Sequence, residues 1–174
     1  MEKSCPLDIL EQITSVEVNY VDFNGTEKSG MIEVNKKVAH DVLGFFELAK
    51  KINFPIARVA SSNDSEFAGN DNKLMATNVS SGFNYRVIAG TDKLSLHSYG
   101  MAFDINPAQN PYVRYRDNLV TIESDGVIWD PTQPGTLYAE HPLVQFMTSR
   151  GWEWGGNWLP KSGRTDYQHF QKSK

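Results

Sequence analysis

One short stretch, residues 95–106, combines residue types that bind metals with the alternation of a β-strand. His97 and Asp104 lie near its two ends. Its second half alternates bulky apolar residues with small ones: Met101, Phe103 and Ile105 against Gly100 and Ala102. A period of two points the bulky side chains into a core, and we expect the small residues and Asp104 to border a metal ion or a substrate. The alternative is an ordinary hairpin with a surface histidine.

Of the four histidines in the chain, His97 and His169 suit a metal site best. His40 falls on the polar side of a predicted helix and His141 at a helix start, so we interpret both as structural or exposed. With Asp104, the first two make a set of two imidazoles and one carboxylate that leaves a coordination position open. Zinc held in this way lowers the pKa of a bound water to roughly 7, which suits hydrolysis of a peptide bond.

A water nucleophile also needs a proton acceptor. Asp166, three residues before His169, is the best-placed carboxylate in the last segment, and Glu153 is the weaker candidate. Because Asp166 and His169 have opposite parity on a regular strand, we expect Asp166 to lie in the turn before that strand.

Arg86 and Ser95 are candidates for contacts with a substrate. A guanidinium near the metal can clamp a carboxylate or stabilise a developing oxyanion, although spacing alone favours a structural salt bridge. Ser95 either hydrogen-bonds the substrate or caps a turn. Trp152, Trp154 and Trp158 either stack on sugar rings or, as is commoner in a terminal strand region, form the core and the pocket wall.

Composition predicts one globular domain over residues 1–174. The chain is 40% hydrophobic and 22% charged, its formal net charge is −4, and it shows no internal repeat or linker. The lack of a basic run argues against nucleic-acid binding. Cys5 is the one cysteine, so folding needs no internal disulfide.

No segment of the sequence reaches the length needed for a membrane span, and residues 1–6 lack the apolar region of a signal peptide. A target outside the cell therefore requires a leader missing from this sequence, a holin-like route or lysis.

Hydrophobic periodicity predicts the elements of the first half of the chain. Alternation indicates a hairpin of residues 16–20 and 31–34, with Asn24-Gly25 in the turn. Helical spacing predicts an amphipathic helix over 36–51, and 56–60 is typical of a short buried strand.

The second half alternates predicted loops with short elements. We expect a long polar loop over 61–81, a strand over 83–89 that carries Arg86, and a second polar excursion over 109–135. A short helix over 141–150 should end at Gly151.

The motifs together resemble the VanY-like zinc peptidases, the family of D-alanyl-D-alanine carboxypeptidases and L-alanyl-D-glutamate endopeptidases. The motifs are Ser95-x-His97-x-x-Gly100-x-Ala102-x-Asp104, Gly151-Trp152-x-Trp154-Gly155-Gly156-x-Trp158, Asp166-x-x-His169-Phe170, Met75-x-x-Asn78, Ser81-x-Phe83-Asn84-x-Arg86 and Asp104-Ile105-Asn106-Pro107-x-x-Asn110-Pro111-Tyr112. The resemblance spans roughly residues 16–171.

The resemblance implies a role for each motif residue. His97, Asp104 and His169 would bind one zinc ion, and Asp166 would be the catalytic acid and base. Arg86 would face the substrate. Ser95 would lie near the substrate. The implied fold is a small α+β domain whose antiparallel sheet carries the zinc and is flanked by helices.

Two positions depart from the family pattern. Relatives often have aspartate at the position of Asn157 and glutamate at the position of Gln171. Neither position corresponds to a ligand, so we expect altered hydrogen bonding around the metal with the metal retained.

The resemblance implies a peptidase that cuts the peptide stem of peptidoglycan at the bacterial cell wall or in the periplasm, and we expect a monomer. With an aspartate, Asp166, as its acid and base, the chain resembles the endopeptidases of phage lysins and spore-formers more than the carboxypeptidases. We therefore expect an endolysin-like enzyme that cleaves the L-alanyl-D-glutamate bond, with the D-alanyl-D-alanine bond as the second choice. A mononuclear non-haem iron oxygenase uses a similar ligand set, but the spacing of His97 and Asp104 is a poor match. A non-catalytic wall-binding module would not need Asp166.

Overall fold

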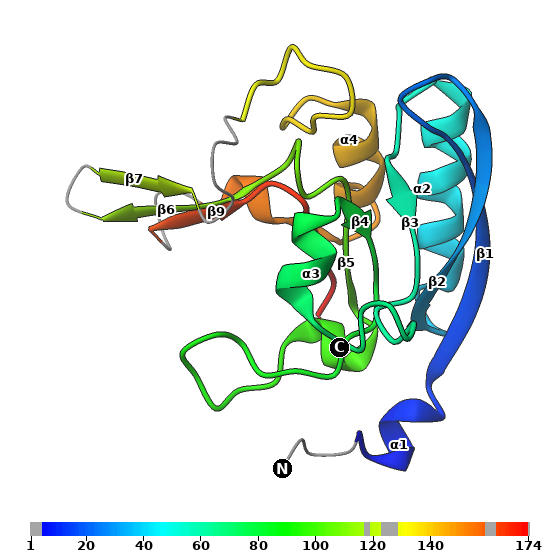
Figure 1. The fold of residues 1–174 in the computed structure, drawn as a ribbon, viewed down its shortest axis with the longest axis vertical. Helices are drawn as coiled ribbons and strands as arrows, with labels where there is room; N and C mark the ends of the chain where they lie inside the picture. The colour runs from blue at the N-terminus through cyan, green and yellow to red at the C-terminus, as the bar shows by residue number, and fades with distance from the viewer. Residues whose placement is uncertain (1–4, 117–118, 123–128, 159–162, 174) are drawn as a thin grey trace.

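The computed structural model describes residues 5–116, 119–122, 129–158 and 163–173. Helices and mainly antiparallel strands alternate along the chain, so the predicted α+β class is confirmed (Figure 1). Among the described residues, none of the helices has both the length and the apolar character of a membrane span.

The N-terminal part is a hairpin covered by a helix. After α1 (Leu7–Leu10), strand β1 (Ile13–Val21) pairs with β2 (Glu27–Asn35), as the alternation predicted. Gly25 takes a φ of 76° in the connecting turn. Helix α2 (Ala39–Lys51) confirms the predicted amphipathic helix and packs against β1.

A three-stranded antiparallel sheet lies at the centre of the molecule and is called the core sheet below. Its strand order is β5 (Ala102–Asp104), β10 (His169–Gln171) and β8 (Glu153–Trp154). Helix α4 (Pro142–Thr148) packs against α2 and β8 and is followed by Gly151 at a φ of 80°, as predicted.

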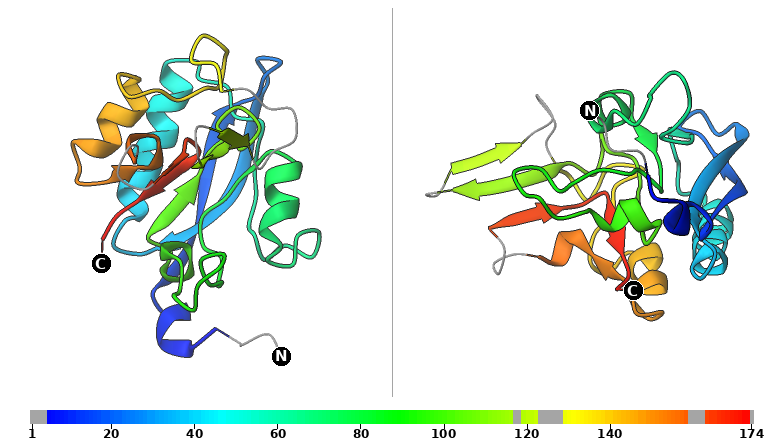
Figure 2. Two further views of the ribbon diagram at one scale, coloured as in Figure 1. Left: turned by 90° about the vertical axis from the view of Figure 1, so that its left-hand side faces the viewer. Right: turned by 90° about the horizontal axis from the view of Figure 1, so that it is seen from below.

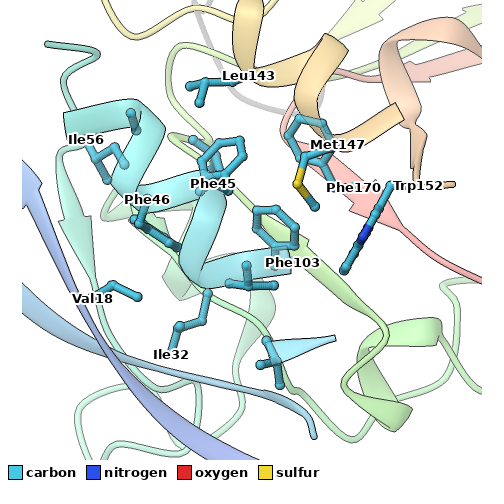
Figure 3. Close-up of a cluster of buried hydrophobic side chains, with 14 of the residues drawn as sticks. Val18, Ile32, Phe45, Phe46, Ile56, Phe103, Leu143, Met147, Trp152 and Phe170 are labelled. Carbon is cyan, nitrogen blue, oxygen red and sulfur yellow. The ribbon is translucent and has the colours of Figure 1, made fainter. Parts of the chain in front are cut away.

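The hydrophobic core joins the core sheet to α2 and α4. Phe45 of α2 makes edge-to-face contacts with Phe103 and Phe170, whose rings stack with centroids 5.2 Å apart (Figure 3). These three side chains are fully buried, so β5 and β10 sit in close-packed surroundings.

The expected long loop over 61–81 contains two short elements. Helix α3 (Asp71–Ala76) begins at Asn70, whose side chain accepts a hydrogen bond from the backbone N–H of Lys73. Strand β4 (Val79–Ser80) then pairs in parallel with β3 (Arg58–Val59). Strand β3 lies inside the stretch 56–60 that was predicted as a short buried strand. The prediction of one long loop over the whole of 61–81 is therefore wrong.

A second three-stranded antiparallel sheet projects from the body of the molecule and is called the projecting sheet (Figures 1 and 2). Its order is β7 (Leu119–Ile122), β6 (Tyr112–Arg116) and β9 (Arg164–Asp166). The expected excursion over 109–135 therefore contains a hairpin. Residues 117–118 and 123–128 of that stretch lie outside the described residues.

The strand predicted over 83–89 is also wrong. This segment forms no named strand and runs beside the 3-10 helix η1 (Leu96–Tyr99), to which backbone hydrogen bonds tie it. The amide of Ser95 donates to the carbonyl of Arg86 (3.0 Å), and that of Asn84 donates to the carbonyl of His97 (3.2 Å). Arg86 is therefore held next to the residues that precede β5.

Candidate metal centre and substrate cavity

Three buried side chains from distant parts of the chain converge on one point and are called the ligand cluster. His97 Nε2 lies 3.1 Å from His169 Nδ1 and 3.2 Å from Asp104 Oδ2, and His169 Nδ1 lies 2.9 Å from Asp104 Oδ1. Donor atoms bound to one tetrahedral zinc at about 2.0–2.1 Å lie roughly 3.3 Å from one another. The cluster therefore fits a metal ion in both donor chemistry and spacing.

The core sheet and η1 bring the cluster together. Asp104 ends β5 and stands directly opposite His169, the first residue of β10, in the antiparallel register. His97 belongs to η1, whose first turn is capped by the Ser95 side chain and whose last residue precedes Gly100 in the left-handed conformation. The tight turn at Gly100 returns the chain from η1 into β5.

Each histidine uses its other ring nitrogen for an outward hydrogen bond. His97 Nδ1 lies 2.7 Å from the carbonyl oxygen of Gly82, and His169 Nε2 lies 3.1 Å from Oε1 of Gln171. Donation to these two oxygens assigns the outer nitrogens as N–H groups and leaves His97 Nε2 and His169 Nδ1 with lone pairs toward the cluster. Gln171 is oriented in turn, because its amide donates to Glu153 at 2.8 Å.

Gly82 was not singled out from the sequence, although its close packing places the carbonyl that holds His97. A Cβ at residue 82 would stand 2.2 Å from the carbonyl oxygen of Glu33 on β2. Only glycine lets the backbone approach the hairpin this closely.

The charges within the cluster favour a carboxylate between two imidazoles. Burial alone would raise the pKa of Asp104, but His97 and His169 hold it well below its ordinary value. Burial would lower the pKa of His169, and the hydrogen bond and charge of Asp104 raise it instead. Since a metal ligand must be unprotonated, a cation would compete with a proton for His169.

The cluster opens into a cavity of about 530 Å³, which Asp166 also lines. Burial raises the pKa of Asp166 to about 6, with the charge of Asp104 adding to the rise. Its Oδ1 is buried without a hydrogen-bond partner among the described residues. Asp166 is the last residue of β9, where it stands opposite Tyr112, so its expected place in the turn is wrong. That turn follows it and leads into β10.

Both readings of Arg86 have a counterpart in the structure. Its Nη2 forms a salt bridge with Asp71 of α3 at 3.0 Å, and its guanidinium also lines the cavity. Ser95 accepts a hydrogen bond from the backbone N–H of His97 at 3.3 Å, which is the capping role, and it also lines the cavity.

The tryptophans divide between core and cavity wall. Trp152 and Trp154 are buried, and their indole N–H groups donate to Asp41 and to the carbonyl of Tyr167. Trp158 lines the cavity, with its ring centre 5.4 Å from that of His169. Glu153, the weaker candidate for the base, is exposed and does not line the cavity.

The two histidines set aside in the sequence lie away from the cluster. His40 is exposed on α2. His141 caps α4, because its Nδ1 accepts a hydrogen bond from the backbone N–H of Leu143 at 3.2 Å. Both structural interpretations therefore agree with their surroundings.

The expectation that Gly100 and Ala102 border the metal is wrong. A Cβ on Gly100 would stand 2.5 Å from the backbone N of Asn35 and 2.7 Å from Ile13, both in the N-terminal hairpin. Ala102 is fully buried and neither residue lines the cavity. Their small size serves the packing of η1 and β5 on the hairpin.

Sequence reasoning missed the cavity residues of the projecting sheet. Tyr112 and Arg114 of β6 and Arg164 of β9 all line the cavity beside Asp166. The available signal was parity, since Arg164 precedes Asp166 by two residues and so shares its face on a strand.

Comparison with known protein families gives a match to part of the chain. The model of a family described as D-alanyl-D-alanine carboxypeptidase matches residues 89–172, a little under half of the chain. The predicted resemblance to the VanY-like peptidases is confirmed over this part, which contains the ligand cluster and Asp166. Searches of curated proteins and of solved structures find no significant match.

Proposed function

We propose that this chain, whose residues 89–172 match the D-alanyl-D-alanine carboxypeptidase family, is a zinc-dependent peptidase of the peptidoglycan stem, with the L-alanyl-D-glutamate bond preferred. The observation that carries the proposal is the meeting of the ligand cluster and Asp166 in one cavity. The alternative is cleavage of the D-alanyl-D-alanine bond, which the description of the matching family favours.

His97 Nε2, His169 Nδ1 and an oxygen of Asp104 would hold the zinc ion, since these atoms face one another in the cluster. A zinc ion bound there would activate a water molecule as a nucleophile and polarise the scissile carbonyl. The hydrogen bonds to Gly82 and Gln171 hold the two imidazole rings in the orientation that binding requires.

Asp166 would carry the proton. A general base works best when its pKa lies near the working pH, and burial raises the pKa of this carboxyl to about 6. Asp166 accepts a proton from the attacking water and returns it to the amine that leaves. Its buried Oδ1, without a partner among the described residues, is available to accept that proton.

Arg86 would stabilise the negative charge that develops on the carbonyl oxygen. Asp71 holds one of its terminal nitrogens, and Nε is buried without a hydrogen-bond partner among the described residues. A guanidinium fixed in this way donates to an oxyanion without reorganising. Ser95 would contribute mainly by capping η1 and so positioning His97.

The test is digestion of purified peptidoglycan with the zinc-loaded protein, followed by mass spectrometry of the products. We expect glycan that retains a single L-alanine and stem fragments that begin with D-glutamate. Free D-alanine alone would reverse the order of the two bonds. Full activity of His97→Ala would contradict the metal mechanism.

The same digest separates the other classes of function. A wall-binding module would bind the peptidoglycan without releasing products. An iron oxygenase would need oxygen and ferrous iron for turnover. We expect hydrolysis in the absence of oxygen and its loss in Asp166→Asn.

A further inference from the structure

Two arginines stand directly opposite each other on the projecting sheet. The register of β6 and β9 pairs Arg114 with Arg164, and both side chains line the cavity that contains the ligand cluster. A guanidinium stays charged at all physiological pH values, and like charges directly across a strand pair destabilise a sheet. The pair therefore concentrates positive charge on one part of the cavity wall.

Aromatic rings fix both guanidiniums at the cavity. The guanidinium carbon of Arg114 lies 5.5 Å from the ring centre of Tyr112, and that of Arg164 lies 5.4 Å from the ring centre of Trp158. Such contacts restrict a long side chain to few orientations. Tyr112 and Trp158 line the same cavity, so the two charges are held at its wall.

The arginine pair and the proposed base lie on one face of the projecting sheet. Tyr112 and Asp166 stand opposite each other in the same pair of strands, two residues from Arg114 and Arg164. Two residues of a strand span about 7 Å, and residues two apart share a face. Arg114 and Arg164 therefore stand about two residue lengths from Asp166 on the same face, so one short peptide can reach both the arginines and the base.

We propose that Arg114 and Arg164 form a subsite for a substrate carboxylate next to the scissile bond. This inference rests on the proposed function, which it deepens by naming the chemical feature that selects the substrate. A guanidinium offers parallel N–H donors that match the two oxygens of a carboxylate, a geometry that lysine cannot reproduce. Arg86 serves a separate task because Asp71 holds it on the α3 side of the cavity.

A stem peptide can supply this carboxylate from two sources. When D-glutamate is linked through its side-chain carboxyl, its α-carboxylate stays free beside the L-alanyl-D-glutamate bond. When D-alanine ends the stem, its terminal carboxylate lies beside the D-alanyl-D-alanine bond. Each source can be removed by converting its carboxylate to a carboxamide.

The test therefore compares two pairs of synthetic stem peptides. One pair carries D-glutamate or D-isoglutamine after L-alanine, and the other ends in D-alanyl-D-alanine or its amide. Cleavage is measured with the zinc-loaded wild type, with Arg114→Gln and Arg164→Gln, and with both changes together. Arg150→Gln, on exposed residue 150 outside the cavity, is the matched control.

We expect the wild type to cleave the carboxylate member of one pair roughly tenfold or more faster than the amide in kcat/KM. Each single change should reduce this ratio, and the double change should bring it to about one by slowing the carboxylate peptide alone. Arg150→Gln should retain the full ratio. The pair that shows the preference identifies the source of the carboxylate.

A binding measurement separates this inference from the proposed function. Affinities of the same peptides are determined calorimetrically for Asp166→Asn with and without the two arginine changes. Arginine-dependent preference for a carboxylate without hydrolysis by the wild type would support the subsite and contradict the peptidase. Hydrolysis and binding with equal preference in the wild type and the double variant would overturn the subsite.

Discussion

The two three-stranded sheets that meet at the cavity differ in the size of the side chains that they bury. The core sheet supplies Asp104 and His169, and its rings Phe103 and Phe170 are fully buried. In the projecting sheet, the buried side chains among those described are Val113 and Thr165.

This difference in burial matches the positional precision that each of the two proposed tasks requires. A metal site requires ligand distances within a few tenths of an ångström, and close-packed surroundings hold side chains to that precision. A peptide subsite needs charges and a base at approximate positions along a strand. We infer that the core sheet maintains the metal site and that the projecting sheet carries the contacts that choose the substrate.

The largest expected effect comes from the core sheet. Phe170→Ala removes a buried ring that contacts Phe45 and Phe103, and we expect a loss of about 3–5 kcal/mol in the free energy of unfolding. Arg164→Gln on the projecting sheet should change this quantity by no more than about 0.5 kcal/mol. Urea denaturation measures both variants, and equal losses would remove the distinction between the sheets.

The next effect concerns the turn that leads into β5. Gly100→Ala combines a φ of +64° with a Cβ 2.5 Å from the backbone of Asn35, and should cost about 2–4 kcal/mol. Gly25→Ala is the matched control, because it has a φ of +76° but open space around it and should cost only about 1–2 kcal/mol. Activity per folded molecule should be unchanged in both. Selective loss of activity in Gly100→Ala would instead support the expectation from the sequence that Gly100 borders the cavity.

A smaller effect tests the outer hydrogen bonds of the ligand cluster. Gln171→Ala removes the acceptor for His169 Nε2 and should weaken zinc binding about 10–100-fold. Gln171→Glu keeps an acceptor but places a second carboxylate beside Glu153, and we expect the repulsion between them to weaken zinc binding. Adding Glu153→Gln to Gln171→Glu should restore the zinc affinity. Zinc titration with a competing chelator measures all of these variants. Unchanged affinity in Gln171→Ala would show that His169 is oriented by other contacts.

The smallest effect concerns α4, which supports the core sheet. Burial lowers the pKa of His141, whose neutral ring caps the helix, so its contribution is present above the ordinary pKa and is lost as pH falls through the lowered one. His141→Ala should cost about 1 kcal/mol at pH 7.5 and less at pH 5. His141→Asn retains a cap and should show a weaker pH dependence. Urea denaturation at both pH values checks this, and a constant cost would argue against the titration.

The ligand cluster could be predicted from the sequence because residue type restricts it strongly. Four histidines and one alternating strand left His97, Asp104 and His169 as the best set, and the structure brings them together. The hydrophobic pattern likewise predicted the N-terminal hairpin and α2, which are long enough for periodicity to identify.

The errors occurred where elements are short or where contacts depend on register. Helix α3 has only six residues, too few for a helical period, and its one signal was the cap at Asn70. Strand β6 combines two tyrosines and one valine with two arginines, so its composition does not distinguish it from a polar loop. The pairing of Arg114 with Arg164 follows from register between distant segments, which no local pattern specifies.

Some motif residues proved to have structural tasks. Asn106 accepts a hydrogen bond from the backbone N–H of Ala57 and donates to the carbonyls of Pro55 and Gly135. Asn110 also donates to Gly135. Residue type alone could not separate these buried amides from contacts with a substrate, because both uses require the same groups.

The central claim is that the core sheet and η1 bind the metal while the projecting sheet supplies the base. The most direct test is zinc titration, with stem-peptide hydrolysis measured in parallel, of the wild type, Asp104→Asn and Asp166→Asn. We predict that Asp104→Asn loses both zinc affinity and hydrolysis, whereas Asp166→Asn keeps its zinc affinity and loses about 10²–10⁴-fold in kcat. Wild-type zinc affinity in Asp104→Asn, or wild-type hydrolysis in Asp166→Asn, would contradict it.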